Sequence, residues 1–157
     1  MISTRLSGTD WLDAQRVPYE TIPFSDDAPL ASAAERLKCN PSQIMAVELF
    51  VNEKDAVIVV RPFSQRTDIS LVEKHVGLNG LRPAVGNESV VRTGLPIEKL
   101  HPFLENYVWK VLDESIFQNE FVYIRAGRAN EIVKVEANAL KYVIGVVNGL
   151  LAEVTVE

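Results

Sequence analysis

The chain has 157 residues, of which 47% are apolar and 24% are charged, and this composition is typical of one globular domain that spans residues 1–157. Its formal net charge of −5 argues against broad affinity for nucleic acid, including DNA, because phosphate binding draws on clustered Lys and Arg. A single cysteine, Cys39, excludes an internal disulfide, and with only two histidines the chain is a poor candidate for a zinc site.

The first third of the chain alternates short strands with short helices. After a loose or helical lead-in over the first twelve residues, Arg16–Ile22 predicts a strand at a sheet edge, because Pro18 cannot donate to a central ladder. Ser32 and Glu35 have the spacing of a capping box and predict a short helix. Asn40–Gln43 repeats this pattern and predicts one helical turn.

The middle of the chain contains the most apolar strands. Met45–Val51 and Ala56–Arg61 are predicted strands, joined by a hairpin turn at Asn52–Asp55. The continuous β-branched run of the second strand indicates burial on both of its faces. These two strands should therefore form the centre of the sheet.

The rest of the chain predicts further short elements, each bounded by residues that typically begin or end them. Asp68 can cap a helix that Gly77 ends, and a second helix runs from Asn87 and ends at Gly94. Strands are expected at 81–85, 107–112, 121–125 and 132–135, a helix at 137–144 that Gly145 stops, and a last core strand in the apolar tail. This order predicts a mixed α/β fold, with a largely antiparallel, barrel-like sheet surrounded by short helices.

Motifs of several enzyme classes are absent from the sequence. It has no Gly-x-Gly-x-x-Gly, no phosphate-binding loop ending in Gly-Lys-Ser/Thr and no His-Glu-x-x-His. No apolar run approaches the ~20 residues of a membrane-spanning helix, and the N-terminus lacks the pattern of a secretory signal. We therefore expect a cytoplasmic protein without a membrane anchor or a bound metal.

Several short segments, in this order and spacing, are similar to one known family. They are Ala33–Leu37, Gln43–Leu49, Arg66–Asp68, Glu88–Gly94, Pro102–Phe103, Asp113–Ser115 and Ala126–Arg128. Over residues 17–145 the chain resembles the YbaK/prolyl-tRNA synthetase-associated editing domains. The resemblance implies a domain that hydrolyses the ester of a mischarged aminoacyl-tRNA in trans, without metal or organic cofactor. It also implies the tRNA acceptor end, and an aminoacyl-tRNA synthetase, as partners.

The sequence departs from this family at two places that bear on catalysis. Active members carry a lysine near the position of Ala46, where an ammonium would orient the ester or stabilise charge on its carbonyl. In the loop from Thr93 to Pro102, Glu98 and Lys99 replace glycines that allow close approach of the backbone to a ligand. The pocket chemistry is therefore altered.

The resemblance nevertheless places a substrate pocket in this chain. Its expected residues are Met45, Ala46, Glu98, Lys99, His101, Pro102 and Gly127. Lys99 and His101 are the candidates for a catalytic group that enters from the opposite wall; the alternative is a solvated lysine and a structural histidine. If the domain hydrolyses esters, we expect a water positioned by backbone groups and by the substrate's own hydroxyl.

Basic residues near a predicted turn are candidates for contacts with the phosphates of the tRNA acceptor end. They are Arg125, Arg128, Lys134 and Lys141. The alternative is a solvated basic face that balances Glu131 and Glu136. For the whole domain, the competing hypothesis is a noncatalytic binding module for an amino-acid-like ligand, a tRNA end or a protein partner. An amine within reach of the pocket floor would favour the enzyme, and a purely apolar cleft the binder.

Overall fold

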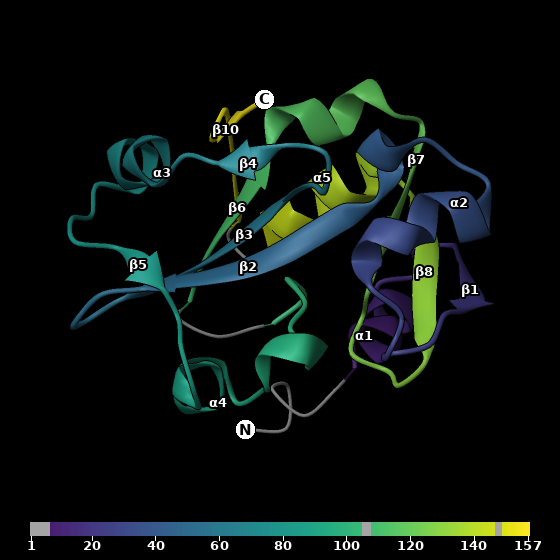
Figure 1. The fold of residues 1–157 in the computed structure, drawn as a ribbon, viewed down its shortest axis with the longest axis horizontal. Helices are drawn as coiled ribbons and strands as arrows, with labels where there is room; N and C mark the ends of the chain where they lie inside the picture. Colours follow the sequence, from purple (N-terminus) through teal and green to yellow (C-terminus); the bar gives the residue numbers. More distant parts are fainter. Residues whose placement is uncertain (1–6, 105–107, 147–148) are drawn as a thin grey trace.

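The computed structural model describes residues 7–104, 108–146 and 149–157, and its centre is a five-stranded mixed sheet (Figure 1). Its strand order is β5-β2-β3-β6-β9. The strands are β2 (Met45–Val51), β3 (Ala56–Pro62), β5 (Arg82–Pro83), β6 (Trp109–Asp113) and β9 (Gly149–Ala152). The hairpin expected at 52–55 is confirmed: β2 and β3 pair antiparallel, with Met45 opposite Pro62 and Val51 opposite Ala56.

Two smaller sheets complete the strand framework. One has the order β1-β8-β7 and the other pairs β10 with β4. Their strands are β1 (Tyr19–Pro23), β4 (Arg66–Thr67), β7 (Phe121–Ile124), β8 (Glu131–Glu136) and β10 (Thr155–Val156). An isolated bridge between Ile44 and Tyr123 connects the start of β2 to β7. The edge position expected for the first strand is confirmed.

The mixed α/β architecture is confirmed, but the described strands do not close into a barrel. β3 pairs with β6 and β6 with β9 in parallel, while the other strand pairs of the described residues are antiparallel, so the pairing is mixed and largely antiparallel as expected. Parallel neighbours need long crossover connections, and the chain between β3 and β6 supplies one that carries two helices. β9 is the last strand in this order and pairs only with β6, so the central sheet is open at this edge within the described residues.

Short helices surround the sheets in Figure 1. They are α1 (Gly8–Ala14), α2 (Ala33–Leu37), α3 (Ile69–Val76), α4 (Glu88–Thr93) and α5 (Ala137–Val146), with 3-10 turns η2 (Leu30–Ser32), η3 (Pro41–Gln43), η4 (Ile97–Lys99) and η5 (Glu114–Gln118). None of the helices in the described ranges has the length and apolarity needed to cross a bilayer.

Most helix boundaries follow the capping residues that the sequence indicates. Asp68 accepts from the backbone amides of Ser70 and Leu71, and Gly77 ends α3 in the left-handed region. The backbone N–H of Asn40 donates to Gln43 Oε1 at 2.9 Å, as the predicted capping box requires.

Other expected boundaries are wrong. The hydroxyl of Ser32 donates to Pro29 O because Ser32 still belongs to η2, so it does not cap α2. Gly145 does not stop α5, which continues to Val146. β1 begins at Tyr19 rather than Arg16, and β5 is only two residues long. The predicted start of β6 at Tyr107 lies outside the described residues.

The central sheet separates two apolar clusters. One contains Met45, Leu49 and Val51 from β2, together with Trp11 and Phe103, whose rings stack at 5.8 Å between centroids. The other contains Phe50 from β2, Val57 and Val59 from β3, and Val72 and Val76 from α3. Alternation of side chains along β2 thus sends its odd-numbered residues to one cluster and its even-numbered residues to the other face.

Candidate functional site

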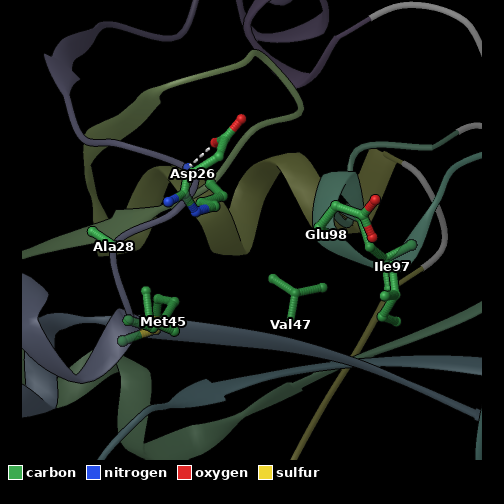
Figure 2. Close-up of a pocket in the computed structure, with 9 residues that line it drawn as sticks. Asp26, Ala28, Met45, Val47, Ile97 and Glu98 are labelled. Atoms are coloured by element: carbon green, nitrogen blue, oxygen red, sulfur yellow. Dashed lines mark hydrogen bonds and ion pairs between the residues drawn. The ribbon is translucent and has the colours of Figure 1, made fainter.

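A cleft of about 190 Å³ opens beside the first residues of β2. It is lined by Asp26, Ala28, Leu30, Met45, Val47, Ile97, Glu98, Leu100 and Arg125. Figure 2 shows Met45 and Val47 on the strand at the base, Ile97 and Glu98 on one side and Asp26 above. These residues come from four separated segments, which the tertiary fold brings to one place.

The floor of the cleft is apolar. Met45 and Val47 are two residues apart on β2, so both project from the same face of the strand. Met45 and Leu100 are 2% and 3% exposed, so both are packed into the core and border the cleft with only a small part of their surface. A space of this size holds about six waters at roughly 30 Å³ each, which is room for one amino-acid side chain but far less than a nucleotide needs.

The rim is polar and is organised around Asp26. Its Oδ1 accepts from Arg125 at 2.7 Å and from the backbone N–H of Asn130 at 3.0 Å, and Lys99 Nζ lies 3.4 Å from Oδ2. The Asn130 hydrogen bond, followed by the one from Lys99, lowers the pKa of Asp26 below its usual value, so this carboxyl is ionised at neutral pH. Arg125 also lies over the Phe24 ring at 5.0 Å.

One wall of the cleft belongs to the loop after α4, where η4 places both Ile97 and Glu98 in the lining. His101 and Pro102 are buried behind this wall and do not line the cleft. His101 Nδ1 accepts from the backbone N–H of Phe103 at 3.2 Å, and the two rings stack. His101 therefore has a structural position.

Gly127 fixes how closely the turn between β7 and β8 approaches this wall. Its φ is +92°, and a Cβ there would lie 3.0 Å from His101 Cδ2. Only glycine combines this conformation with this contact at low cost. Gly127 therefore allows the β7–β8 turn to pack directly against His101.

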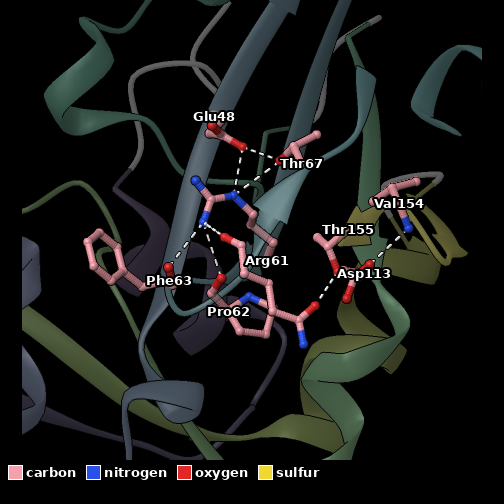
Figure 3. Close-up of polar contacts among 9 residues, drawn as sticks. Glu48, Arg61, Pro62, Phe63, Thr67, Asp113, Val154 and Thr155 are labelled. Atoms are coloured by element: carbon pink, nitrogen blue, oxygen red, sulfur yellow. Dashed lines mark hydrogen bonds and ion pairs between the residues drawn. The ribbon is translucent and has the colours of Figure 1, made fainter. Parts of the chain in front are cut away.

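Ala46 lies on the opposite face of β2 from the cleft. It pairs in register with Arg61 on β3, and paired residues project to the same side of a sheet. On that side Glu48 accepts from Arg61 Nε at 2.9 Å and from the Thr67 hydroxyl (Figure 3). Met45 and Val47 are the residues of β2 that face the cleft. An amine at position 46 would therefore point away from the cleft.

Each of the four basic residues proposed for RNA contact has a partner within the protein. Arg125 is at the cleft, while Arg128 pairs with Asp10 at 2.9 Å on the following turn. Lys134 Nζ lies 4.8 Å from the centroid of the Phe121 ring, and Lys141 Nζ lies 5.7 Å from that of Phe117. Of the expected pocket residues, the structure brings Met45 and Glu98 into the lining and Lys99 to the rim.

Sequence reasoning missed much of the lining. Asp26, Ala28, Leu30, Val47, Ile97 and Leu100 were not expected there. The alternation of β2 could have identified Val47 once Met45 was chosen. Nothing near Asp26 in the sequence indicates its pairing with Arg125, which is 99 positions away. No group of three metal-ligating side chains occurs within the part of the chain that the structure describes.

A family model for the aminoacyl-tRNA editing domain matches residues 27–142. This chain belongs to the aminoacyl-tRNA editing domain family. The editing domain shares its fold with the hypothetical protein APE2540, with a TM-score of 0.81 and 24% identity over 94% of this chain and 98% of that one. It also shares it with a candidate trans-editing enzyme for prolyl tRNA synthetase, with a TM-score of 0.78 and 19% identity over 100% of this chain and 99% of that one. The comparison with curated proteins gave no match.

Family membership gives the cleft of this editing domain a chemical context. The lining combines an apolar base with two carboxylates and a guanidinium at its mouth. Such a site can hold a small apolar group and orient a polar, charged group next to it. No lysine lines it, so any ammonium must come from the rim, where Lys99 is the nearest one identified.

Proposed function

We propose that this editing domain binds the aminoacyl end of a mischarged tRNA in the cleft and hydrolyses its ester in trans. The observation that carries the proposal is the cleft itself: an apolar floor of side-chain size beneath a charged rim, in a chain of this family. The amino acid would rest on the floor, and its ester would lie at the rim. Arg128, half exposed on the turn after Arg125, would contact phosphates of the acceptor end.

In the proposed reaction a water attacks the ester carbonyl carbon. The bond from that carbon to the ribose oxygen breaks, and the ribose oxygen takes up a proton as the free amino acid leaves. Backbone groups and the neighbouring ribose hydroxyl would position the water, while the floor holds the substrate in place. The protein's contribution is then mainly orientation and exclusion of competing side chains.

Lys99 is the candidate for the ammonium that the floor lacks. Its 3.4 Å contact with Asp26 is long for a charged hydrogen bond, and its side chain is 30% exposed. Releasing an exposed pair of this kind costs less than about 1 kcal/mol, so Lys99 would be able to turn toward a bound ester. There it would stabilise negative charge that develops on the carbonyl oxygen.

The test is release of amino acid from a panel of mischarged tRNAs, with wild type beside Lys99→Ala and Met45→Lys. Wild-type turnover that falls at least tenfold in Lys99→Ala would support a deacylase with an ammonium from the rim. Lys54→Ala, on the hairpin far from the cleft, is the matched control and should leave turnover unchanged. An inactive wild type would overturn the proposal.

A noncatalytic binding module is the second candidate, and the apolar floor favours it. Met45 and Val47 offer no charge to a reacting carbonyl. On this hypothesis the domain binds an aminoacyl end, an amino-acid-like ligand or a protein without turnover. Turnover that appears only in Met45→Lys would support it, since a lysine there restores a floor ammonium on the face that lines the cleft.

A further inference from the structure

Glu98 differs from the other charged residues of the cleft because its carboxylate has no hydrogen bond or ion pair with any described residue. Asp26 and Arg125 are bound to each other at 2.7 Å, and Asp26 has further donors in Asn130 and Lys99. Glu98 is exposed and lines the cleft beside Ile97. It is therefore the carboxylate available to a ligand.

The geometry of η4 gives this carboxylate its place. In a 3-10 turn, consecutive side chains point about 120° apart. Ile97 and Glu98 both reach the cleft, whereas Lys99 reaches across to Asp26. Figure 2 shows the Glu98 carboxylate above Ile97 and away from the base formed by Met45 and Val47. A negative charge thus lies at a cleft of about 190 Å³ whose base is apolar.

We propose that Glu98 binds the α-ammonium group of the aminoacyl ester, and that the cleft selects an amino acid with an uncharged, apolar side chain. This inference rests on the proposed function, whose substrate it narrows. An aminoacyl ester presents an α-amino group and a side chain on one carbon, which matches a carboxylate adjoining an apolar floor. A charged side chain would lose its hydration on that floor without a partner. A blocked amino group would lose its charge and with it the attraction of Glu98.

Direct binding tests the inference without relying on hydrolysis. The probes are valine joined by an amide bond to the 3′-amino group of 3′-amino-3′-deoxyadenosine, and its N-acetylated form, titrated calorimetrically at about pH 6 so that the free amine is charged. N-acetylation should weaken binding to wild type about fivefold or more. Glu98→Gln should weaken binding of the free amine by a similar factor and leave binding of the acetylated probe unchanged.

Two further arms complete the test. Glu53→Gln removes an exposed carboxylate on the β2–β3 hairpin and should bind both probes as wild type does. The lysine amide should bind at least about tenfold more weakly than the valine amide. Equal losses for both probes in Glu98→Gln, no binding of the valine amide, or a lysine amide that binds as well would overturn the inference.

The same variants separate this inference from the proposed function. Coupling between Glu98 and the free amine, without amino-acid release from any mischarged tRNA, would overturn hydrolysis and support the recognition by Glu98. Release by wild type that Glu98→Gln leaves unchanged, with no coupling in the binding experiment, would overturn the recognition alone.

Discussion

Over residues 45–48, the two faces of β2 carry different kinds of chemistry. On the cleft side, Met45 and Val47 face open space. On the other side, Glu48 is held by Arg61 and Thr67, and Arg61 also donates to the carbonyls of Pro62, Phe63 and Gln65 (Figure 3). Over residues 45–48, one face is thus apolar and borders the cleft, and the other carries paired polar groups, whereas Leu49, Phe50 and Val51 are buried in the two apolar clusters.

This difference separates stability from function along a single strand. A network of paired groups fixes the turn after β3 and gives little to a ligand, because its donors and acceptors are already used. An unfilled apolar face loses packing energy and is available for binding. Within residues 45–48 of β2, the residues that face the cleft are therefore candidates for recognition, whereas Glu48 on the opposite face belongs to a network that stabilises the fold.

The largest effect is expected on the polar face. Arg61→Ala removes the donor to Glu48 and to three carbonyls of the following turn, from a side chain that is only 14% exposed. It should lower the free energy of unfolding by about 3 kcal/mol, because it leaves the turn carbonyls without this donor and Glu48 without its cation, with only the Thr67 hydroxyl as a partner. Urea unfolding followed by circular dichroism measures this loss.

Arg66→Ala is the matched control for Arg61. Arg66 is exposed on neighbouring β4, and its removal should change the free energy of unfolding by less than about 0.5 kcal/mol. Similar losses in the two variants would show that the network does not stabilise the turn, and the contrast between the faces would then be wrong.

A middle-sized effect is expected where the wall of the cleft meets the β7–β8 turn. Gly127→Ala introduces a Cβ at φ +92° and 3.0 Å from His101 Cδ2, and should cost about 2 kcal/mol of stability. Gly80→Ala shares a positive φ, +72°, but its Cβ meets nothing within 4 Å, so it should cost about 1 kcal/mol. The difference in unfolding free energy between the two variants measures the cost of the contact with His101. Equal losses in the two variants would mean that His101 moves aside at little cost.

The smallest effect is expected at the rim of the cleft. The hydrogen bond from Asn130, followed by that from Lys99, lowers the pKa of Asp26 in the folded state. A lowered folded pKa means that the stabilisation is complete above the unfolded value of about 3.9 and is lost as the pH falls through the folded pKa. Because the Asp26 side chain is 36% exposed, its contribution should stay below about 1 kcal/mol.

Comparison of wild type with Asp26→Asn tests this pH dependence. The unfolding free energies should differ at neutral pH and converge in strongly acidic buffer, where the wild-type carboxyl is protonated. A difference that stays constant across this range would show that ionisation of the Asp26 carboxyl does not contribute to the free energy of unfolding.

Local patterns predicted much of the fold. The caps at Asp68 and Asn40, the hairpin at 52–55 and the buried strand after it are all present, since each depends on neighbours in the chain. The motif order also identified the family, which the match over residues 27–142 confirms. The predicted barrel failed because parallel pairing of β3, β6 and β9 depends on contacts between distant segments.

The candidate site shows the same division more sharply. The sequence by itself determined that Met45 and Ala46 have opposite orientations, because side chains alternate along any strand. Only the tertiary structure decided which of the two faces the cleft, since that depends on what packs against each side of β2. Likewise, the sequence places no basic residue next to Asp26, and the fold brings Arg125 and Lys99 to it from 99 and 73 positions away. Charge pairs between such distant positions leave no local pattern, because their geometry exists only after the sheets and loops have packed together.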